Sequence, residues 1–240
     1  MLIKDYRLLS FGCLGTLVDR DSGIATALRP LAARSGKGAR REDLLAAFAR
    51  HEAAARDSGK LASLSEVLAE AHARLAREWG ATCSEGDHRL FARSVRDWPA
   101  FPDAAGSLQY LKRYFRLALV SAADRDTLRT IDRQLEAGFD LVCAAPEDGA
   151  LKPDSRIFGA LLSGAARLGV PPGRALHVAA HLDHDLAPAA ESGLDCAWLD
   201  RPGRQPGAAT GTAAAARHRF EYVFTSLAHL VRTHQEQLRA

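Results

Sequence analysis

Residues 6–19 read YRLLSFGCLGTLVD, and the fold is best predicted from this stretch outward. Its first half, residues 6–11, is a short apolar run that ends at Gly12. A short apolar run bounded by glycine is typical of a buried strand that ends in a turn. If the strand belongs to an open parallel sheet, the residues after it lie where ligands bind.

Short apolar runs alternate with stretches of helical periodicity beyond residue 98. The runs predict strands at residues 117–120, 141–144, 175–179, 196–199 and 222–224. The periodic stretches predict helices at residues 104–113, 125–137, 155–168, 186–192 and 226–238. This alternation predicts an α/β fold, a Rossmann-like parallel sheet flanked by helices. Right-handed crossovers then place the carboxyl ends of all strands along one edge.

Residues 24–93 follow a different pattern, because apolar residues recur at helical spacing and no run resembles a strand. This pattern predicts about four helices. We therefore expect an inserted helical cap at residues 20–96 and an α/β core formed by residues 1–19 and 97–240. Residues 201–217 are rich in Gly, Pro and Ala and predict a flexible loop.

The bulk properties exclude several classes of protein. The net charge is +3 and both signs are mixed along the chain, so neither nucleic acid nor a membrane surface is an expected partner. No apolar run approaches the ~20 residues of a membrane span, and the first residues are too charged for a signal peptide. The four cysteines have neither zinc-ligand nor disulfide-framework spacing. We expect a cytoplasmic protein that binds a small molecule; a homodimer is compatible with these features.

Four segments follow predicted strands and should meet at one edge of the sheet. They are FGCLGTLVD at 11–19, LVSAAD at 119–124, GALKPD at 149–154 and HVAAHLDHD at 177–185. In this order, and with WPAFPD at 98–103, they resemble the four motifs of the haloacid dehalogenase (HAD) superfamily. The resemblance covers nearly the whole chain and is closest to L-2-haloacid dehalogenase-like hydrolases with a helical cap.

The first motif departs from the family at its most important position. In relatives the first strand ends in an aspartate that attacks the substrate and forms an ester; the matching residue here is Gly12. Loss of a covalent nucleophile typically costs on the order of 10⁶ in rate. Relatives that bind Mg²⁺ also use that aspartate. Asp185 alone is thin coordination for an octahedral ion, so no cofactor is expected, and Mg²⁺ is an alternative with weak support.

Three residues match the later motifs, namely Ser121, Lys152 and Asp185. We expect Lys152 and Asp185 to form a partly buried ion pair, which would serve stability or chemistry. Leu14 and Ala122 replace the aromatic residue and the asparagine that the dehalogenase branch commonly has. Several departures together favour natural divergence, although a nucleophile removed by engineering stays open.

The fourth motif is rich in titratable residues: His177, His181, Asp183, His184 and Asp185. His181 or His184 is a candidate for acid/base work, a metal site is an alternative, and a helix capped by Asp183 and Asp185 is the structural interpretation. His177 alternates within a strand and fits a core position.

Two further residues of the first motif have a chemical and a structural interpretation. Cys13 is a nucleophile only with a base nearby, and a small buried residue otherwise. Asp19 fits a capping or hinge position better than a replacement carboxylate.

These patterns support three functions. The first is a repurposed enzyme that performs non-covalent acid/base chemistry on a small molecule in the cleft between core and cap, where the missing carboxylate opens space. Its catalytic candidates are Lys152, Asp185, Ser121, His181 and His184, and its substrate-binding candidates are Gly12, Cys13, Leu14, Ala122 and Asp183. The second is a non-catalytic pseudo-hydrolase that binds a metabolite or protein. The third is a conventional HAD hydrolase or dehalogenase, or a variant deprived of its nucleophile. The polar fourth motif favours the enzyme.

Overall fold

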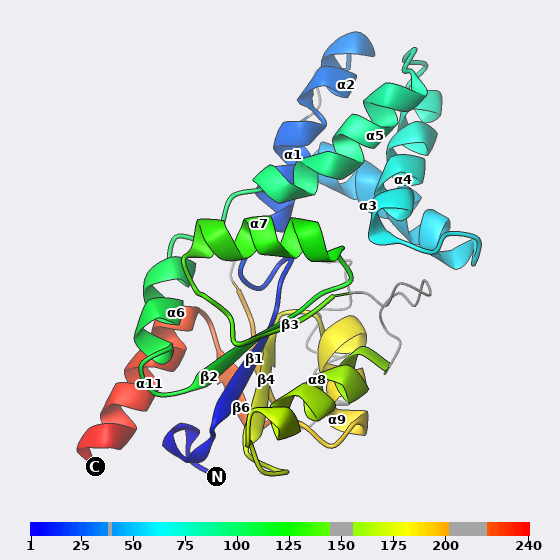
Figure 1. Cartoon of the computed structure of the whole chain (residues 1–240). Coiled ribbons are helices and arrows are strands. Elements are labelled where there is room, and N and C mark those ends of the chain that lie inside the picture. Colours follow the sequence, from blue (N-terminus) through cyan, green and yellow to red (C-terminus); the bar gives the residue numbers. More distant parts are fainter. Residues whose placement is uncertain (38–39, 145–155, 202–219) are drawn as a thin grey trace.

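The structure is a computed structural model, and it describes residues 1–37, 40–144, 156–201 and 220–240. Its centre is a parallel sheet of six described strands in the order β3-β2-β1-β4-β5-β6 (Figure 1). The strands are β1 (Leu8–Gly12), β2 (Arg116–Val120), β3 (Leu141–Cys143), β4 (Ala175–Ala179), β5 (Asp195–Leu199) and β6 (Tyr222–Phe224). The predicted α/β parallel sheet is therefore confirmed, and each of the predicted strands is present.

Alternate residues of β1 to β5 enter two separate hydrophobic clusters, since successive side chains point to opposite faces, whereas β6 contributes to the first cluster only. Leu9 and Phe11 pack in the first cluster, and Leu8 in the second. Helices α6 (Ala104–Leu111), α7 (Arg125–Leu135) and α11 (Leu227–Arg239) contribute to the first cluster. Helices α8 (Arg156–Arg167) and α9 (Ala187–Glu191) contribute to the second. Both faces of the sheet are thus covered, as apolar parallel strands require.

Five α-helices lie together beyond the carboxyl edge of the sheet, and we call them the cap helices (Figure 1). They are α1 (Arg20–Ala27), α2 (Arg29–Arg34), α3 (Arg41–Asp57), α4 (Leu64–Glu78) and α5 (Glu85–Arg93), followed by the short turn η2 (Ser94–Asp97). The expectation of four was wrong because the first apolar stretch is divided. Pro30 is the second residue of α2. A proline is tolerated there because the backbone N–H groups of the first helical turn have no partner within the helix.

The segment after β4 also differs from the prediction of one helix at residues 186–192. It starts earlier, with the π-helical turn η3 (Leu182–Leu186), and α9 follows directly. Neither η3 nor α9 has a side-chain N-cap hydrogen bond, so Asp183 and Asp185 lie inside the turn instead of capping a helix. A π-helical turn is often found at a functional site.

Three further expectations concern the loop at 201–217, the division into core and cap, and membrane spans. Most of the predicted loop at 201–217 lies outside the described residues. The division into a core at 1–19 and 97–240 and a cap at 20–96 stays a prediction. Within the described part of the chain, none of the helices combines the length and the apolar character that a membrane span requires.

Candidate functional site

The ends of β1 and β2 and the turn η3 meet the cap helices around a cavity of about 210 Å³. The core side contributes six polar or small residues of the predicted motifs: Cys13, Ser121, Ala122, His181, His184 and Asp185. Three charged side chains of the cap helices, Arg20, Glu52 and Arg56, also line it. The walls are otherwise apolar, with Leu14, Leu64, Leu68 and Trp98 among them. Of the ten predicted site residues, Gly12 and Asp183 do not line the cavity, and Lys152 lies outside the described residues.

Gly12 ends β1 below this cavity and is packed closely. A Cβ atom at Gly12 would lie 2.9 Å from Thr16 Oγ1, 3.2 Å from Ala179 Cβ and 3.5 Å from Asp185 Oδ2. The first motif and the fourth therefore meet at Gly12, as expected. The position of a first side-chain carbon is tight, because a Cβ at Gly12 would require the Thr16 hydroxyl to shift. The expectation that the missing carboxylate opens space at the cleft floor stays a prediction.

The loop after β1 is held by its own hydrogen bonds. The N–H groups of Thr16 and Leu17 donate to Cys13 O at 3.1 and 2.8 Å, and Thr16 Oγ1 accepts from the Ala180 N–H at 3.1 Å. Cys13 is buried within the hydrophobic core, which agrees with the structural interpretation of this residue. These bonds connect the ends of β1 and β4 and fix the floor of the cavity.

Ser121 and Ala122 follow β2 and form another part of the floor. Ser121 is buried, its N–H donates to Cys143 O at 3.0 Å, and its Oγ accepts from the Ala123 N–H at 3.2 Å. This hydrogen bond holds the Ser121 hydroxyl in place, Ser121 lines the cavity, and a serine hydroxyl can donate as well as accept.

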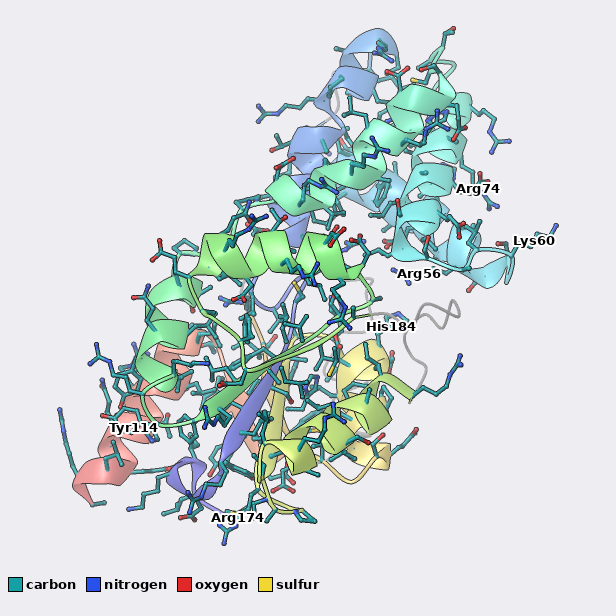
Figure 2. All side chains as sticks on the ribbon, in the orientation of Figure 1. Arg56, Lys60, Arg74, Tyr114, Arg174 and His184 are labelled. Atoms are coloured by element: carbon teal, nitrogen blue, oxygen red, sulfur yellow. The ribbon has the colours of Figure 1, made fainter. Side chains whose placement is uncertain are left out.

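The turn η3 presents two histidines and a carboxylate to the cavity. Asp185 is buried, His181 is half-buried and His184 is exposed. Desolvation, followed by the nearby Arg56 charge, lowers the pKa of His184 below its usual 6.5, against the opposing pull of Asp185, Asp183 and Glu52. Figure 2 shows His184 and Arg56 near each other where the cap helices meet the core. A histidine with a lowered pKa is neutral at pH 7 and can accept a proton.

Two predicted structural residues are confirmed. His177 is fully buried in β4, with its Nδ1 2.9 Å from Ser10 Oγ and its ring against Phe158. Asp19 is the N-cap of α1 and accepts from the Ser22 N–H at 3.1 Å. Its own N–H donates to Pro99 O at 2.7 Å, where the chain returns from the cap helices.

Sequence reasoning missed the charged residues on the cap side of the cavity. Glu52 accepts hydrogen bonds from Arg20 and, at 3.1 Å, from Arg56. Burial raises the pKa of the Glu52 carboxyl, but the charges and hydrogen bonds of the two arginines outweigh it and lower the pKa to about 2. The sequence contained a signal for Glu52, because this charged residue falls on the apolar face of α3, with Phe48 before it and Ala55 after it. A charged residue at such a position is seldom buried without a partner.

A magnesium ion, which the family implies, does not fit the donor set of this cavity. Mg²⁺ requires near-octahedral oxygen ligands. Among the three described atoms nearest to a Cβ at Gly12, the oxygen donors are the Asp185 carboxylate and the Thr16 hydroxyl, and Leu14 offers no side-chain donor. Among the described residues no group of three His, Cys, Asp or Glu side chains is arranged to hold a metal. We therefore derive no chemical step through a metal.

The family and structural relatives of the chain agree with this architecture. The model of the haloacid dehalogenase-like hydrolase family matches residues 6–193. The structure is similar to the putative HAD-hydrolase YfnB from Bacillus subtilis bound to magnesium, with TM-score 0.75, 18% identity and coverage of 95% of this chain and 97% of the other. It is also similar to the defluorinating L-2-haloacid dehalogenase Rha0230, with TM-score 0.74, 25% identity and coverage of 98% and 96%.

A third relative is an L-2-haloacid dehalogenase from Xanthobacter autotrophicus with chloropropionic acid covalently bound, with TM-score 0.74, 19% identity and coverage of 96% and 98%. No curated protein sequence matches the chain. The family match covers more than half of the chain and includes the first, second and fourth motifs around the cavity. The chain belongs to the haloacid dehalogenase-like hydrolase family.

Proposed function

We propose that this chain is an enzyme of its family that has lost the aspartyl nucleophile and performs non-covalent acid/base chemistry on a small molecule. The reaction classes that suit such a site are elimination, isomerisation and direct attack by water. The proposal depends on one observation: β1 ends at Gly12, so no side-chain oxygen projects from this strand end toward the cavity.

The packing around Gly12 supports this proposal over a conventional hydrolase. Thr16 Oγ1 lies 2.9 Å from the position of a Cβ and is itself the acceptor of the Ala180 N–H. A side chain at position 12 would require this hydroxyl to shift, which favours a site that has diverged around glycine over an intact site from which one side chain was removed.

The polar groups of the cavity support catalysis over passive binding. A neutral His184 accepts a proton from the substrate or from a water molecule, and the Ser121 hydroxyl donates a hydrogen bond to charge that develops on an oxygen. Asp185 and His181 complete the polar floor. The resemblance of the third motif to the family is the reason to include Lys152 in the proposed site. Closure of the cap helices would exclude water and strengthen each of these contacts.

The absence of covalent catalysis is tested by intact-protein mass spectrometry. The chain is incubated with 2-chloropropionate and with 4-nitrophenyl phosphate, each with and without Mg²⁺, beside Rha0230 as the positive control for the haloacid. We expect no ester on any residue of this chain and turnover about 10⁶ below that of the control. A trapped ester, or turnover at the rate of the control, would falsify the proposal.

Acid/base catalysis is tested by deuterium exchange into a panel of small carbonyl and carboxylate compounds, followed by NMR. We expect exchange with the wild type and a loss of about 10²-fold or more in His184→Gln. His229→Gln, on α11, is the matched control because His229 does not line the cavity, and it should leave exchange unchanged. Ligand binding without exchange for any compound would favour the pseudo-hydrolase instead.

A further inference from the structure

Arg201 lies two residues beyond β5, at the carboxyl edge of the sheet, and only 6% of its side chain is exposed. Its Nε donates to Thr16 O at 2.9 Å, and its Nη1 donates to Asp103 Oδ1 at 3.0 Å. The guanidinium also lies over the Phe101 ring, with Cζ 3.8 Å from the ring centre, which holds its plane in place. One side chain therefore joins the loop after β1 to the segment at which the chain returns from the cap helices.

Asp103 extends this connection to the last helix of the chain. It is the N-cap residue of α6, yet its side chain makes no capping hydrogen bond to that helix. Its Oδ2 instead accepts from the N–H groups of Leu227 and Ala228, at 2.8 and 3.4 Å, in the first turn of α11. A helix N-terminus and a guanidinium both favour a negative charge. Arg201 is therefore anchored on a carboxylate that is itself held in place.

Thr16 carries the connection in the other direction, into the floor of the cavity. This residue is fully buried; its carbonyl accepts from Arg201, and its Oγ1 accepts from the Ala180 N–H at 3.1 Å. Ala180 directly precedes His181 and the turn η3, which presents His184 to the cavity. Two hydrogen bonds, to the two oxygens of one residue, therefore lead from Arg201 to the segment that bears the proposed base.

The burial of Arg201 is not explained by packing alone. Burial lowers the pKa of its guanidinium below the usual 12.5, although Asp103 and Asp19 act in the opposite direction. Its Nη2 is buried and has no hydrogen-bond partner within the part of the chain that the structure describes. Replacement of a buried ion pair by apolar residues of similar volume is often neutral or stabilising. A connection between two segments, by contrast, requires a group with several donors, such as a guanidinium.

We infer that Arg201 is a positioning residue of this site, which holds Thr16 so that the turn η3 keeps His184 in place. Arg201 is not among the described residues that line the cavity, so it acts through Thr16 and not on the substrate. Such support affects chemistry because a misplacement of about 1 Å costs on the order of 10²-fold in rate. The inference rests on the proposed function for the use of His184 as a base, but its test does not depend on turnover.

The inference is tested by hydrogen exchange of backbone amides, followed by NMR on the full chain under native conditions. Arg201→Met keeps much of the side-chain volume and removes both donors. We expect the Ala180 N–H to exchange about tenfold faster or more, relative to the N–H of Leu119, which is buried in β2. The ratio of the two rates cancels a loss of global stability, because that loss would accelerate both amides alike.

The titration of the His184 ring is a second readout, which a merely structural role of Arg201 would not move. Desolvation is the main cause of the lowered pKa of His184, so displacement of η3 should raise this pKa toward 6.5 in Arg201→Met. Arg174→Met is the matched control. It removes an arginine that donates to Asp5 O at 3.0 Å at the end of the core away from the cap helices (Figure 2), and both readouts should stay unchanged.

A second variant, Arg201→Lys, keeps the inference testable if Arg201→Met folds poorly. Lysine retains the positive charge but has a single nitrogen, so it cannot reproduce the two bonds that the guanidinium makes to Thr16 and Asp103. We expect the Ala180 N–H to be accelerated preferentially in this variant as well.

Three outcomes would overturn the inference. They are an Ala180 exchange rate that is unchanged, an Ala180 rate that rises only in proportion to that of Leu119, and a His184 titration that stays at the wild-type value. If the wild type exchanges no deuterium into small molecules, the proposed function fails, and the amide exchange and the His184 titration still decide the role of Arg201.

Discussion

At the scale of single residues, Gly12 carries the chemical argument and also a packing constraint. It ends β1, it is buried, and three neighbouring atoms surround the position that a Cβ would take. The shortest of these distances, 2.9 Å to Thr16 Oγ1, requires a buried and hydrogen-bonded group to move. Glycine is thus needed here for close approach, independently of what the site catalyses.

Gly12→Ala should therefore destabilise the chain by about 1–3 kcal/mol, the usual cost of an extra carbon in a packed site. Urea denaturation gives the free energy of unfolding. Gly106→Ala is the control, because a Cβ there meets no atom within 4 Å and alanine suits the interior of α6. If Gly12→Ala proves as stable as the wild type, the atoms around Gly12 pack less closely than these distances indicate.

At the scale of elements, helices α1 and α3 are joined by the Arg20–Glu52–Arg56 cluster. Glu52 lies on the buried face of α3, which is otherwise apolar, and the charges of the two arginines compensate for its burial. Removal of one partner from a buried ion pair leaves an uncompensated charge. The cluster therefore contributes to the packing of α1 against α3.

The pH dependence of unfolding should reveal this cluster through Glu52→Gln. The folded pKa of Glu52, about 2, lies below its ordinary 4.5, so its stabilisation is complete above about pH 4.5 and is lost as the pH falls toward 2. The difference corresponds to about 3 kcal/mol. The variant should be less stable than the wild type at pH 7 and should approach it near pH 2.

Glu85→Gln is the control for that comparison. Glu85 pairs with Arg89 on the surface of α5, with side chains that are 69% and 59% exposed, so we expect little change at any pH. A Glu52→Gln difference that persists at pH 2 would show that the effect comes from packing and not from charge.

At the scale of the whole molecule, the chain crosses between sheet and cap helices at two places that lie side by side. The Asp19 N–H donates to Pro99 O and the Phe101 N–H donates to Leu17 O, at 2.7 and 2.9 Å. Arg201, after β5, donates to Thr16 O at 2.9 Å and to Asp103 at 3.0 Å. One hydrophobic cluster runs from β1 into the cap helices. We therefore expect the described parts to unfold together.

Gly23→Ala tests that junction. Gly23 lies in α1 against Trp98, and a Cβ would approach Trp98 Cβ to 2.7 Å. Because Trp98 is buried and its Nε1 donates to Ser94 Oγ at 3.0 Å, it has no easy way to move. We expect a loss of at least about 1–3 kcal/mol, with increased hydrogen exchange in α1 and η2. Unchanged exchange there would argue against a single cooperative unit.

The sequence by itself determined the fold class and much of the site. Alternating apolar runs predicted each described strand of the sheet, because a parallel sheet covered on both faces leaves a strong local pattern. The ordered motifs brought Cys13, Leu14, Ser121, Ala122, His181, His184 and Asp185 to one cavity. These motifs converge because right-handed crossovers join parallel strands and place the carboxyl ends of all of them at one edge of the sheet.

Only the tertiary structure decided what faces these motifs and how closely they pack. Arg20, Glu52 and Arg56 join the cavity through the docking of cap helices that are distant in sequence, and no local pattern encodes which helix faces meet. The close packing around Gly12 likewise depends on the relative positions of the β1 loop, β4 and η3. Periodicity reports which face of an element is buried, whereas distances between elements arise from side-chain packing across the whole molecule.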